Sequence, residues 1–329
     1  MPKIIRFHSL GAPENLKLEE LPLRAPGEGE VKLRVQAVGL NRAELVFMQG
    51  FYLEQPALPS QIGYEAAGVV ESVGPGVNSA WVGKSIATIP GFSMSKNGVL
   101  GEEAIVPADS LGEYPAKLSP TEAAAIWMQY LTAYGALITF GGLKRGDFVI
   151  ITAASSSVGL AAIQIVNAEG AVPIAATRRS NKSAELLALG AKHVIATEEE
   201  DLVAKVQEIT AGQGARLVFD PVGGPGIEKL AEAAAFHGIV LEYGRLDPRP
   251  APFPLVSALR KGLSIRGYSL LEIRRDPKLL KTAKQYVFDR LADGRFHPKI
   301  AKAFPLAQSV EAYQYLASNQ QVGKVVITV

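Results

Sequence analysis

The stretch that decides the fold is DFVIITAASSSVGLAAIQIVNAEGA, residues 147–171. In it, the apolar run FVIIT meets a turn of small residues, and an apolar pattern with helical spacing follows. A helix that begins directly after a strand presents unpaired backbone N–H groups and the positive end of its dipole, and both attract a phosphate group. The sequence therefore predicts a dinucleotide-binding strand–turn–helix here.

The turn departs from the usual glycine-rich pattern, because Ser155, Ser156 and Ser157 precede Val158 and Gly159. Glycine lets the backbone approach a phosphate closely, whereas serine adds a Cβ atom but also a hydroxyl donor. Two interpretations stay open: the serines adopt angles that glycine takes freely, or the loop shifts so that their hydroxyls bind phosphate. The alternative to a cofactor site is an ordinary strand–turn–helix in which a serine caps the start of the helix.

The end of the next strand lies about 20 residues further on, where NAD-binding sites usually carry an acid for the ribose 2′-hydroxyl. The segment AVPIAATRRSNK has no acid there. It carries Arg178, Arg179 and Lys182, with Thr177 and Ser180 as neutral donors. Because arginine pairs bidentately with phosphate, the sequence predicts NADP(H) rather than NAD(H). The alternative is that these basic residues simply lie in solvent at the start of a helix and bind no phosphate.

Strands and helices alternate after the turn, which predicts a doubly wound parallel sheet. The first 115 residues instead alternate apolar and polar residues between Gly and Pro turns, as in 28–41, 66–77 and 84–90, and are predicted to be β-rich. The closing strand GKVVITV needs a sheet, and we expect it to join the first domain. The expected division is residues 1–120 with 277–329, and residues 121–276.

Composition narrows the function classes. The chain has 329 residues, 34 basic and 32 acidic side chains, four histidines and no cysteine. Because the net charge is near zero, the chain has no excess of basic residues that would favour binding to nucleic acid or to an anionic membrane. The lack of cysteine excludes disulfides and thiolate chemistry. The uncharged segment 123–143 is predicted to be a buried helix rather than a membrane span. The N-terminus lacks the apolar stretch of a signal peptide, so we expect a cytoplasmic protein.

Seven motifs together resemble the medium-chain dehydrogenase/reductases, specifically the zinc-independent quinone oxidoreductase (zeta-crystallin-like) branch. They are VKLRVQAVGLNRAEL, LPSQIGYEAAGVVESVGPGVN, LTAYGAL, ITAASSSVGLAAIQIVNAEGA, LGAKHVI, LVFDPVGGP and GKVVI. The resemblance runs nearly end to end. It implies an α/β protein with a GroES-like β-rich catalytic domain plus a doubly wound Rossmann domain. It also implies a homodimer formed through the edge strand at 263–270.

Alcohol dehydrogenases of this family hold a catalytic zinc with a Gly-His-Glu motif, and the matching positions here are Gly63, Tyr64 and Glu65. A catalytic zinc normally needs three protein ligands, and the few histidines are widely scattered. We therefore expect no metal. What remains is hydride transfer from a nicotinamide to a quinone, an enone or a 2-enoyl thioester.

The resemblance implies three catalytic residues: Asn41 near the nicotinamide, Tyr52 as proton donor or carbonyl anchor, and Tyr64 in the place of the zinc-ligand histidine. Each has an alternative role in packing. Asn41 could be a turn residue at a strand end, Tyr52 a packed aromatic in a loop, and Tyr64 a side chain that fills the empty metal site. The expected cofactor-binding residues are Asn41, Gln129, Thr132, Ser155, Ser156, Ser157, Val158, Thr177, Arg178, Lys182, Tyr243, Gly244 and Lys324.

These observations favour an NADPH-dependent, zinc-independent reductase of a small-molecule quinone or other α,β-unsaturated carbonyl. A 2-enoyl thioester reductase, acting on an acyl-CoA or acyl carrier protein substrate, is the alternative within the enzymes. A non-catalytic NADPH-binding protein with a regulatory or structural role is the alternative outside them. Neither nucleic acid nor a membrane is an expected partner.

Overall fold

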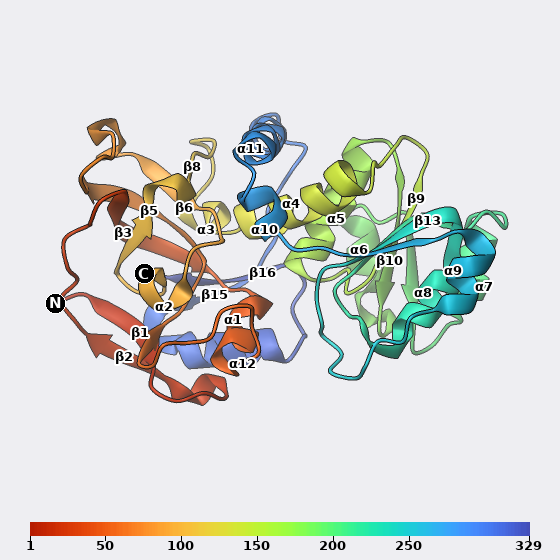
Figure 1. Ribbon diagram of the computed structural model, residues 1–329, viewed down its shortest axis with the longest axis horizontal. Coiled ribbons are helices and arrows are strands. Elements are labelled where there is room, and N and C mark those ends of the chain that lie inside the picture. Colours follow the sequence, from red (N-terminus) through yellow and green to blue (C-terminus); the bar gives the residue numbers. More distant parts are fainter. The chain divides into compact units, whose positions relative to one another are not determined.

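The computed structural model describes residues 1–329, and the chain divides into two compact units. The first unit comprises Met1–Met128 and Lys284–Val329, and the second comprises Gln129–Ala283. Both contain strands and helices (Figure 1), which confirms the predicted α/β fold class. The expected domain bounds at residues 120 and 277 stay a prediction, and each unit is described below by itself.

The first unit is built mainly from strands. They are β1 (Lys3–Phe7), β2 (Leu16–Glu20), β3 (Glu30–Gly39), β4 (Ser60–Gln61), β5 (Glu65–Val73), β6 (Ser85–Thr88), β7 (Glu103–Pro107), β8 (Leu111–Gly112), β15 (Ile300–Pro305) and β16 (Lys324–Thr328). One sheet has the order β2-β1-β4, and the larger one has the order β15-β16-β3-β5-β6-β8, with β7 also paired to β3. Along β3, buried and more exposed residues largely alternate, as expected where one face of a strand meets the core.

The closing strand joins the first unit, as predicted. β16 pairs antiparallel with β3, where Val326 lies opposite Gly39, and parallel with β15. The Leu40 N–H donates to the Val325 carbonyl at 2.9 Å. This register brings the start of β16 beside the residues that follow β3, where the candidate site begins.

Short helices complete this unit. They are α1 (Arg42–Met48), α2 (Met94–Asn97), α3 (Pro120–Ala123) and α12 (Ser309–Ala317). At the start of α3, Ser119 and Glu122 form a reciprocal capping box, and Pro120 occupies the first helical position. Phe7, Phe47 and other apolar side chains between the sheets and α12 form the core.

The uncharged segment 123–143 is not the single helix that we expected. α3 ends at Ala123, α4 spans Trp127–Tyr134, and a π-helical turn follows at Gly135–Phe140. Tertiary contacts explain the break. A Cβ atom on Gly39 would lie 1.9 Å from the Ala124 carbonyl oxygen, so that carbonyl packs directly on β3. None of the helices has the length and apolar character needed to cross a membrane.

The second unit contains a parallel sheet, which confirms the predicted doubly wound architecture. Its strands are β9 (Phe148–Ile151), β10 (Val172–Thr177), β11 (His193–Ala196), β12 (Ala215–Asp220), β13 (Ala234–Glu242) and β14 (Ser264–Gly267). Their order is β11-β10-β9-β12-β13-β14, so β14 is an edge strand, as predicted. The order reverses between β9 and β12, the point at which such sheets bind ligands beyond their carboxyl ends.

Helices connect these strands. They are α5 (Ser157–Ala168), α6 (Ser183–Ala188), α7 (Leu202–Ile209), α8 (Ile227–Ala233), α9 (Leu255–Lys261), α10 (Leu271–Arg274) and α11 (Pro277–Ala292), the last of which runs on into the first unit. The apolar strands β9 and β10 are buried along most of their length, as expected for a parallel sheet covered on both faces. α5 matches the helical pattern that was predicted to follow the serine turn.

Candidate active site

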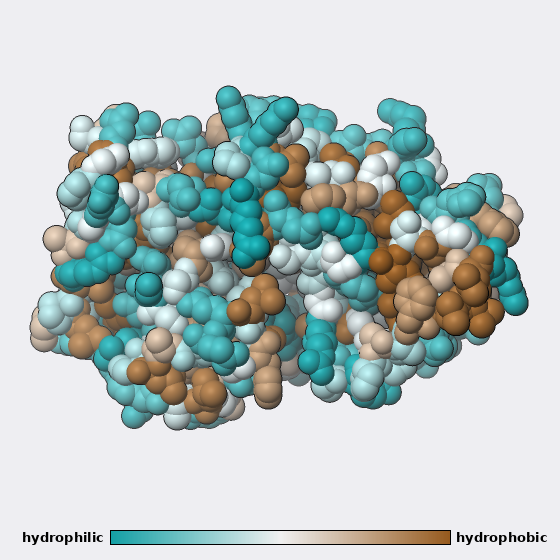
Figure 2. All heavy atoms as spheres, viewed as in Figure 1, coloured by the Kyte–Doolittle hydropathy of each residue, from teal (hydrophilic) through white to brown (hydrophobic).

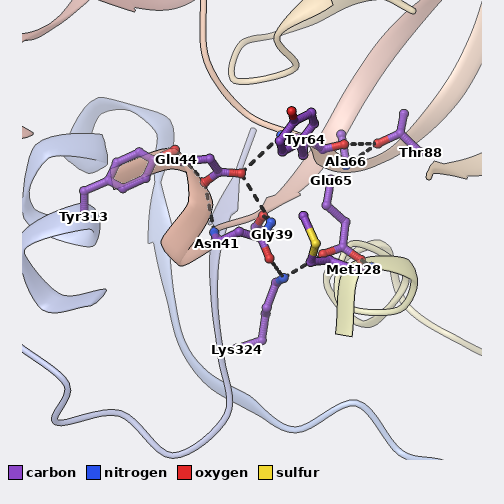
Figure 3. A network of polar contacts seen from close by, with 10 residues as sticks. All are labelled: Gly39, Asn41, Glu44, Tyr64, Glu65, Ala66, Thr88, Met128, Tyr313 and Lys324. Carbon is purple, nitrogen blue, oxygen red and sulfur yellow. Dashed lines mark hydrogen bonds and ion pairs between the residues drawn. The ribbon is translucent and has the colours of Figure 1, made fainter. Parts of the chain in front are cut away.

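A buried polar network in the first unit surrounds the carboxylate of Glu44 (Figure 3). The Asn41 backbone N–H donates to Glu44 Oε2 at 2.9 Å, and the Tyr64 N–H donates to Oε1 at 3.1 Å. The Tyr313 hydroxyl donates to Oε2 at 2.8 Å. Burial raises the pKa of Glu44, while these hydrogen bonds act in the opposite direction. One carboxyl group thus joins the start of α1, the residue before β5 and α12.

A buried ion pair continues the network. Lys324 Nζ lies 2.6 Å from Glu65 Oε2 and 2.7 Å from Asn41 Oδ1, and both charged side chains are fully shielded from solvent. Glu65 Oε1 also accepts from the Met128 N–H at 3.0 Å. Because removing an ammonium from water is costly, Lys324 needs this counter-charge. The pair therefore ties β16 to β5 and to the first turn of α4.

The same contacts occupy the amide of Asn41. Its Nδ2 donates to the Gly39 carbonyl at 3.0 Å and to Glu44 Oε1 at 3.2 Å, and its Oδ1 accepts from Lys324. These bonds give Asn41 and Lys324 a positioning role at the end of β3. Their predicted contacts with substrate or cofactor stay predictions.

Two tyrosines lie beside this network. The Tyr64 ring packs edge-on against Tyr52, with centroids 6.1 Å apart, and against Phe92, with centroids 5.5 Å apart. The Tyr64 carbonyl accepts from Thr88 Oγ1 at 2.9 Å, so its backbone is held on both sides. Burial raises the pKa of both phenols, and the nearby Tyr64 side chain partly offsets this rise for Tyr52. The structure thus brings the predicted residues Tyr52 and Tyr64 together.

The side chains do not form a metal site. No group of three or more His, Cys, Asp or Glu residues comes together in a geometry that could hold a metal ion. At the position that the resemblance matches to the zinc-ligand histidine of alcohol dehydrogenases, the Tyr64 ring packs against Tyr52 and Phe92.

In the second unit, the serine turn lies between β9 and α5. Ser156 is the N-cap of α5, with φ −70° and ψ 160°, and its Oγ accepts from the Gly159 N–H at 3.0 Å. The positive φ in this loop, 45°, falls on Ala153. A Cβ atom on Gly159 would lie 2.6 Å from the Ala154 carbonyl oxygen, so this position requires glycine. The serines themselves have no need of the backbone freedom of glycine.

The predicted basic group lies beside this turn. Lys182 Nζ donates to Ser155 Oγ at 3.1 Å. Partial burial lowers the pKa of Lys182, and the positive charge of Arg178 lowers it further. Arg179 instead pairs with Glu198 at 2.8 Å on the exposed side. Two of the three predicted cations therefore repel each other next to a helix N-terminus, an arrangement that an anion would relieve.

Two carboxyl groups stand at the carboxyl ends of β12 and β13. Asp220 and Glu242 are register partners in the sheet. Asp220 accepts from the Thr152 hydroxyl and from the Gly223 N–H at 2.8 Å, which links it to the loop before α5. Burial, reinforced by the charge of Asp220, raises the pKa of Glu242 to about 8. At neutral pH, Glu242 therefore holds a proton.

The remaining predicted cofactor residues also lie in the second unit. Gln129 and Thr132 are buried in α4, and Gln129 Oε1 has no hydrogen-bond partner there. Tyr243 stacks on Phe219 with centroids 4.0 Å apart, and its buried hydroxyl lies near Ser156 without a hydrogen-bond partner. The structure therefore brings Tyr243 and Lys182 to the serine turn. Thr177 ends β10, Val158 is in the first turn of α5, and Gly244 follows Tyr243.

Sequence reasoning missed Glu44, Thr88, Tyr313 and Glu242, and it assigned no role to Glu65. The signals were present but weak. Glu44 stands three residues after Asn41, the spacing of a capping box. Glu242 is the one acid in the apolar run GIVLEYG, and buried charged residues are rare unless they are paired.

A six-stranded parallel sheet in this order, with a serine-capped helix after its central strand, defines a dinucleotide-binding protein. Comparison with known proteins agrees. The family model described as zinc-binding dehydrogenase matches residues 157–285, and the one described as alcohol dehydrogenase GroES-like domain matches residues 27–116.

Relatives match along nearly the whole chain. Quinone oxidoreductase 1 of Escherichia coli is 30% identical, with 97% of each protein covered. A 2-haloacrylate reductase of a Burkholderia species is 29% identical, over 98% of this chain and 97% of the relative. The crystal structure of Escherichia coli quinone oxidoreductase complexed with NADPH has a TM-score of 0.92 at 29% identity, covering 99% of this chain and 100% of that one. The chain belongs to the medium-chain dehydrogenase/reductase superfamily, with quinone oxidoreductases among its relatives.

Proposed function

We propose that the chain is a zinc-independent, NADPH-dependent reductase that transfers hydride to a quinone or another α,β-unsaturated carbonyl compound. The observation that carries this proposal is the phenol pair Tyr52–Tyr64, with ring centroids 6.1 Å apart, in which Tyr64 stands where the family resemblance implies a zinc-ligand histidine. Reduction of a conjugated carbonyl needs a proton donor. Oxidation of an alcohol by the zinc-dependent route instead needs a Lewis acid. The related quinone oxidoreductase and 2-haloacrylate reductase support this class of reaction.

The second unit contains residues that fit NADP(H). The first turn of α5 offers backbone N–H groups to the pyrophosphate, and Gly159 permits the close packing of this helix. Lys182, Arg178 and Ser155 would hold the 2′-phosphate, whose negative charge would offset the repulsion between the two cations. When bound, NADPH supplies the hydride.

The first unit supplies the proton-donating groups. Hydride addition to a conjugated carbon leaves negative charge on the substrate carbonyl oxygen and the carbon next to it. Tyr52 is the more exposed residue of the pair, and it would donate to this charge. The network around Glu44 and Lys324 fixes the backbone from which Tyr64 projects.

An acceptor panel tests the function. Purified protein with NADPH would be mixed with 1,4-benzoquinone, 9,10-phenanthrenequinone, an alkenal and crotonyl-CoA, and the nicotinamide absorbance followed. We expect turnover with at least one of the first three. Turnover confined to crotonyl-CoA would favour the 2-enoyl thioester reductase instead. NADPH binding without turnover on any acceptor would refute both and leave a non-catalytic NADPH-binding protein.

The cofactor preference has its own experiment. The double variant Arg178→Ala/Lys182→Ala should lose at least tenfold in NADPH affinity, since each charge-assisted hydrogen bond contributes about 1.5–3 kcal/mol. Its NADH affinity should stay within about twofold. Arg179→Ala is the matched control, because Arg179 already pairs with Glu198. Equal affinity of the parent protein for NADH and NADPH would contradict this assignment.

A homodimer and a cytoplasmic location belong to the same proposal. β14 leaves one edge unpaired, and α9 leads directly into it. Leu259 on α9 is 76% exposed, and Figure 2 shows apolar side chains gathered on the face of the second unit where Figure 1 places α9. Light scattering should give twice the chain mass, and Leu259→Glu should reduce it, whereas Leu187→Glu on α6 should not. A monomeric parent would overturn the homodimer.

A further inference from the structure

The loop after α1, residues 51–58, carries the candidate proton donor Tyr52, and apolar burial does little to hold it in place. Tyr52 and Glu54 are half-buried, whereas Phe51 is 81% exposed and Leu53 is 71% exposed. Burial of apolar side chains is the main force that fixes a segment of chain against a folded body. Since the two large apolar side chains on either side of Tyr52 face solvent, other contacts must fix the loop.

Glu54 supplies the strongest of these contacts. Its Oε1 accepts from the Ser93 hydroxyl at 2.5 Å, and its Oε2 accepts from the Met94 N–H at 2.9 Å, so the start of α2 engages both oxygens. Hydrogen bonds to an ionised carboxylate are roughly twice as strong as those between neutral groups. A neutral bond follows three residues later, where the Ala57 N–H donates to Ser95 Oγ at 3.1 Å. The loop is thus tied to α2 mainly by polar groups.

These contacts also fix Tyr52 relative to Tyr64. The Tyr52 ring packs on Tyr64, whose ring packs on Phe92 with centroids 5.5 Å apart. Phe92 directly precedes Ser93, which binds Glu54. The loop therefore meets the same segment at two points that are only two residues apart in the chain. Two such contacts restrict the direction of the Tyr52 side chain as well as its position.

We propose that Glu54 is a positioning residue, which anchors the loop 51–58 to the start of α2 and so holds the Tyr52 hydroxyl in place for proton donation. This inference rests on the proposed function. In that reaction, the Tyr52 O–H bond breaks, its proton goes to the enolate formed by hydride addition, and the phenolate left behind regains a proton from water. Glu54 touches neither proton nor substrate. It acts through geometry, because a displacement of about 1 Å in a reacting group can cost roughly 100-fold in rate.

Two substitutions of Glu54 test this role. In Glu54→Ala, kcat should fall roughly 10- to 100-fold and KM should change less than about threefold, because proton donation by Tyr52 is an interaction of the transition state. Glu54→Gln keeps an oxygen that accepts hydrogen bonds, and its kcat should stay within about fivefold of the parent. Glu102→Ala is the matched control, since that half-buried carboxylate accepts the Lys3 N–H at 2.8 Å but does not contact the loop. It should leave kcat unchanged.

Amide hydrogen exchange follows the loop independently of activity. Exchange in the peptide 51–58 should be at least about tenfold faster in Glu54→Ala than in the parent or in Glu102→Ala, because local opening no longer breaks the carboxylate bonds. Unchanged exchange there would overturn the inference, as would faster exchange with an unchanged kcat, which is the result expected of a merely structural contact.

A double variant tests whether Glu54 acts through Tyr52. Tyr52→Phe alone should lower kcat by about 100-fold or more, as expected for loss of a general acid. Adding Glu54→Ala to it should then cost less than about twofold more. Additive losses would overturn the inference. A parent protein that reduces no acceptor would instead count against the proposed function, and amide exchange would still decide whether Glu54 holds the loop.

Discussion

The acid pair at the ends of β12 and β13 makes stability depend on pH in an unusual direction. Glu242 has a pKa of about 8 in the folded chain, against an ordinary value of 4.5, because it is partly buried beside Asp220. Between these values, the folded chain keeps a proton that the unfolded chain has lost. The stabilisation is therefore fully present below about pH 4.5, and it is lost as the pH rises towards 8.

The magnitude follows from proton linkage. Each pH unit in that window lowers the free energy of unfolding by at most about 1.4 kcal/mol, which would total about 5 kcal/mol. Because Glu242 is partly exposed, solvent screens its interaction with Asp220, and we expect a total of about 2 kcal/mol. Glu242→Gln keeps a hydrogen-bond donor for Asp220 but cannot ionise, so it should lack this decline.

Urea unfolding at several pH values from about 5 to about 8.5 measures the effect. The free energy of unfolding of the parent should fall relative to that of Glu242→Gln by about 2 kcal/mol across this range. Glu232→Gln, which alters an exposed carboxyl group of the same unit, is the control and should run parallel to the parent. Parallel curves for Glu242→Gln and the parent would refute the reasoning about the acid pair.

Three further changes test the two units. Lys324→Met should cost about 3–5 kcal/mol, measured as a fall in thermal or urea stability, because it leaves Glu65 buried and unpaired. Gly159→Ala should cost about 1–3 kcal/mol and weaken NADPH binding in a fluorescence titration, because its Cβ would press on Ala154. Ser156→Ala should lower stability by about 1 kcal/mol and Ser156→Gly by only a few tenths, as for other N-caps, whereas both should weaken NADPH binding if the hydroxyl contacts phosphate.

Local patterns in the sequence were enough to predict most of the fold. The strand–turn–helix at 147–171 and the closing strand follow from spacing and residue type, which act over a few residues, whereas the edge strand at 263–270 was implied by the family resemblance. The break after Ala123 could not be predicted in this way. It depends on the close approach of the Ala124 carbonyl to Gly39, and nothing in the uncharged segment 123–143 signals that contact.

The residues of the candidate site also differ in whether the sequence could predict them. Tyr52 and Tyr64 could be named from the resemblance to a known family, and Lys182 from its place just after the strand that follows the serine turn. Glu44 could not, since Tyr313, which fixes its carboxylate, lies 269 residues further along the chain. A buried carboxyl group has no sequence signature of its own, because its burial and its partners are properties of the packed chain.

The serine turn shows why a departure from a motif need not mean a loss of the site. The glycine-rich pattern combines several separate demands: a left-handed residue, a close helix–strand contact and access to the phosphate. In this chain, Ala153 takes the left-handed angle and Gly159 makes the close contact, so neither demand falls on the serines. Ser156 can then cap α5 through an oxygen lone pair, and its O–H hydrogen stays available to an anion. The substitution of serine for glycine thus changes how phosphate would be bound, from bare backbone to backbone and hydroxyl together.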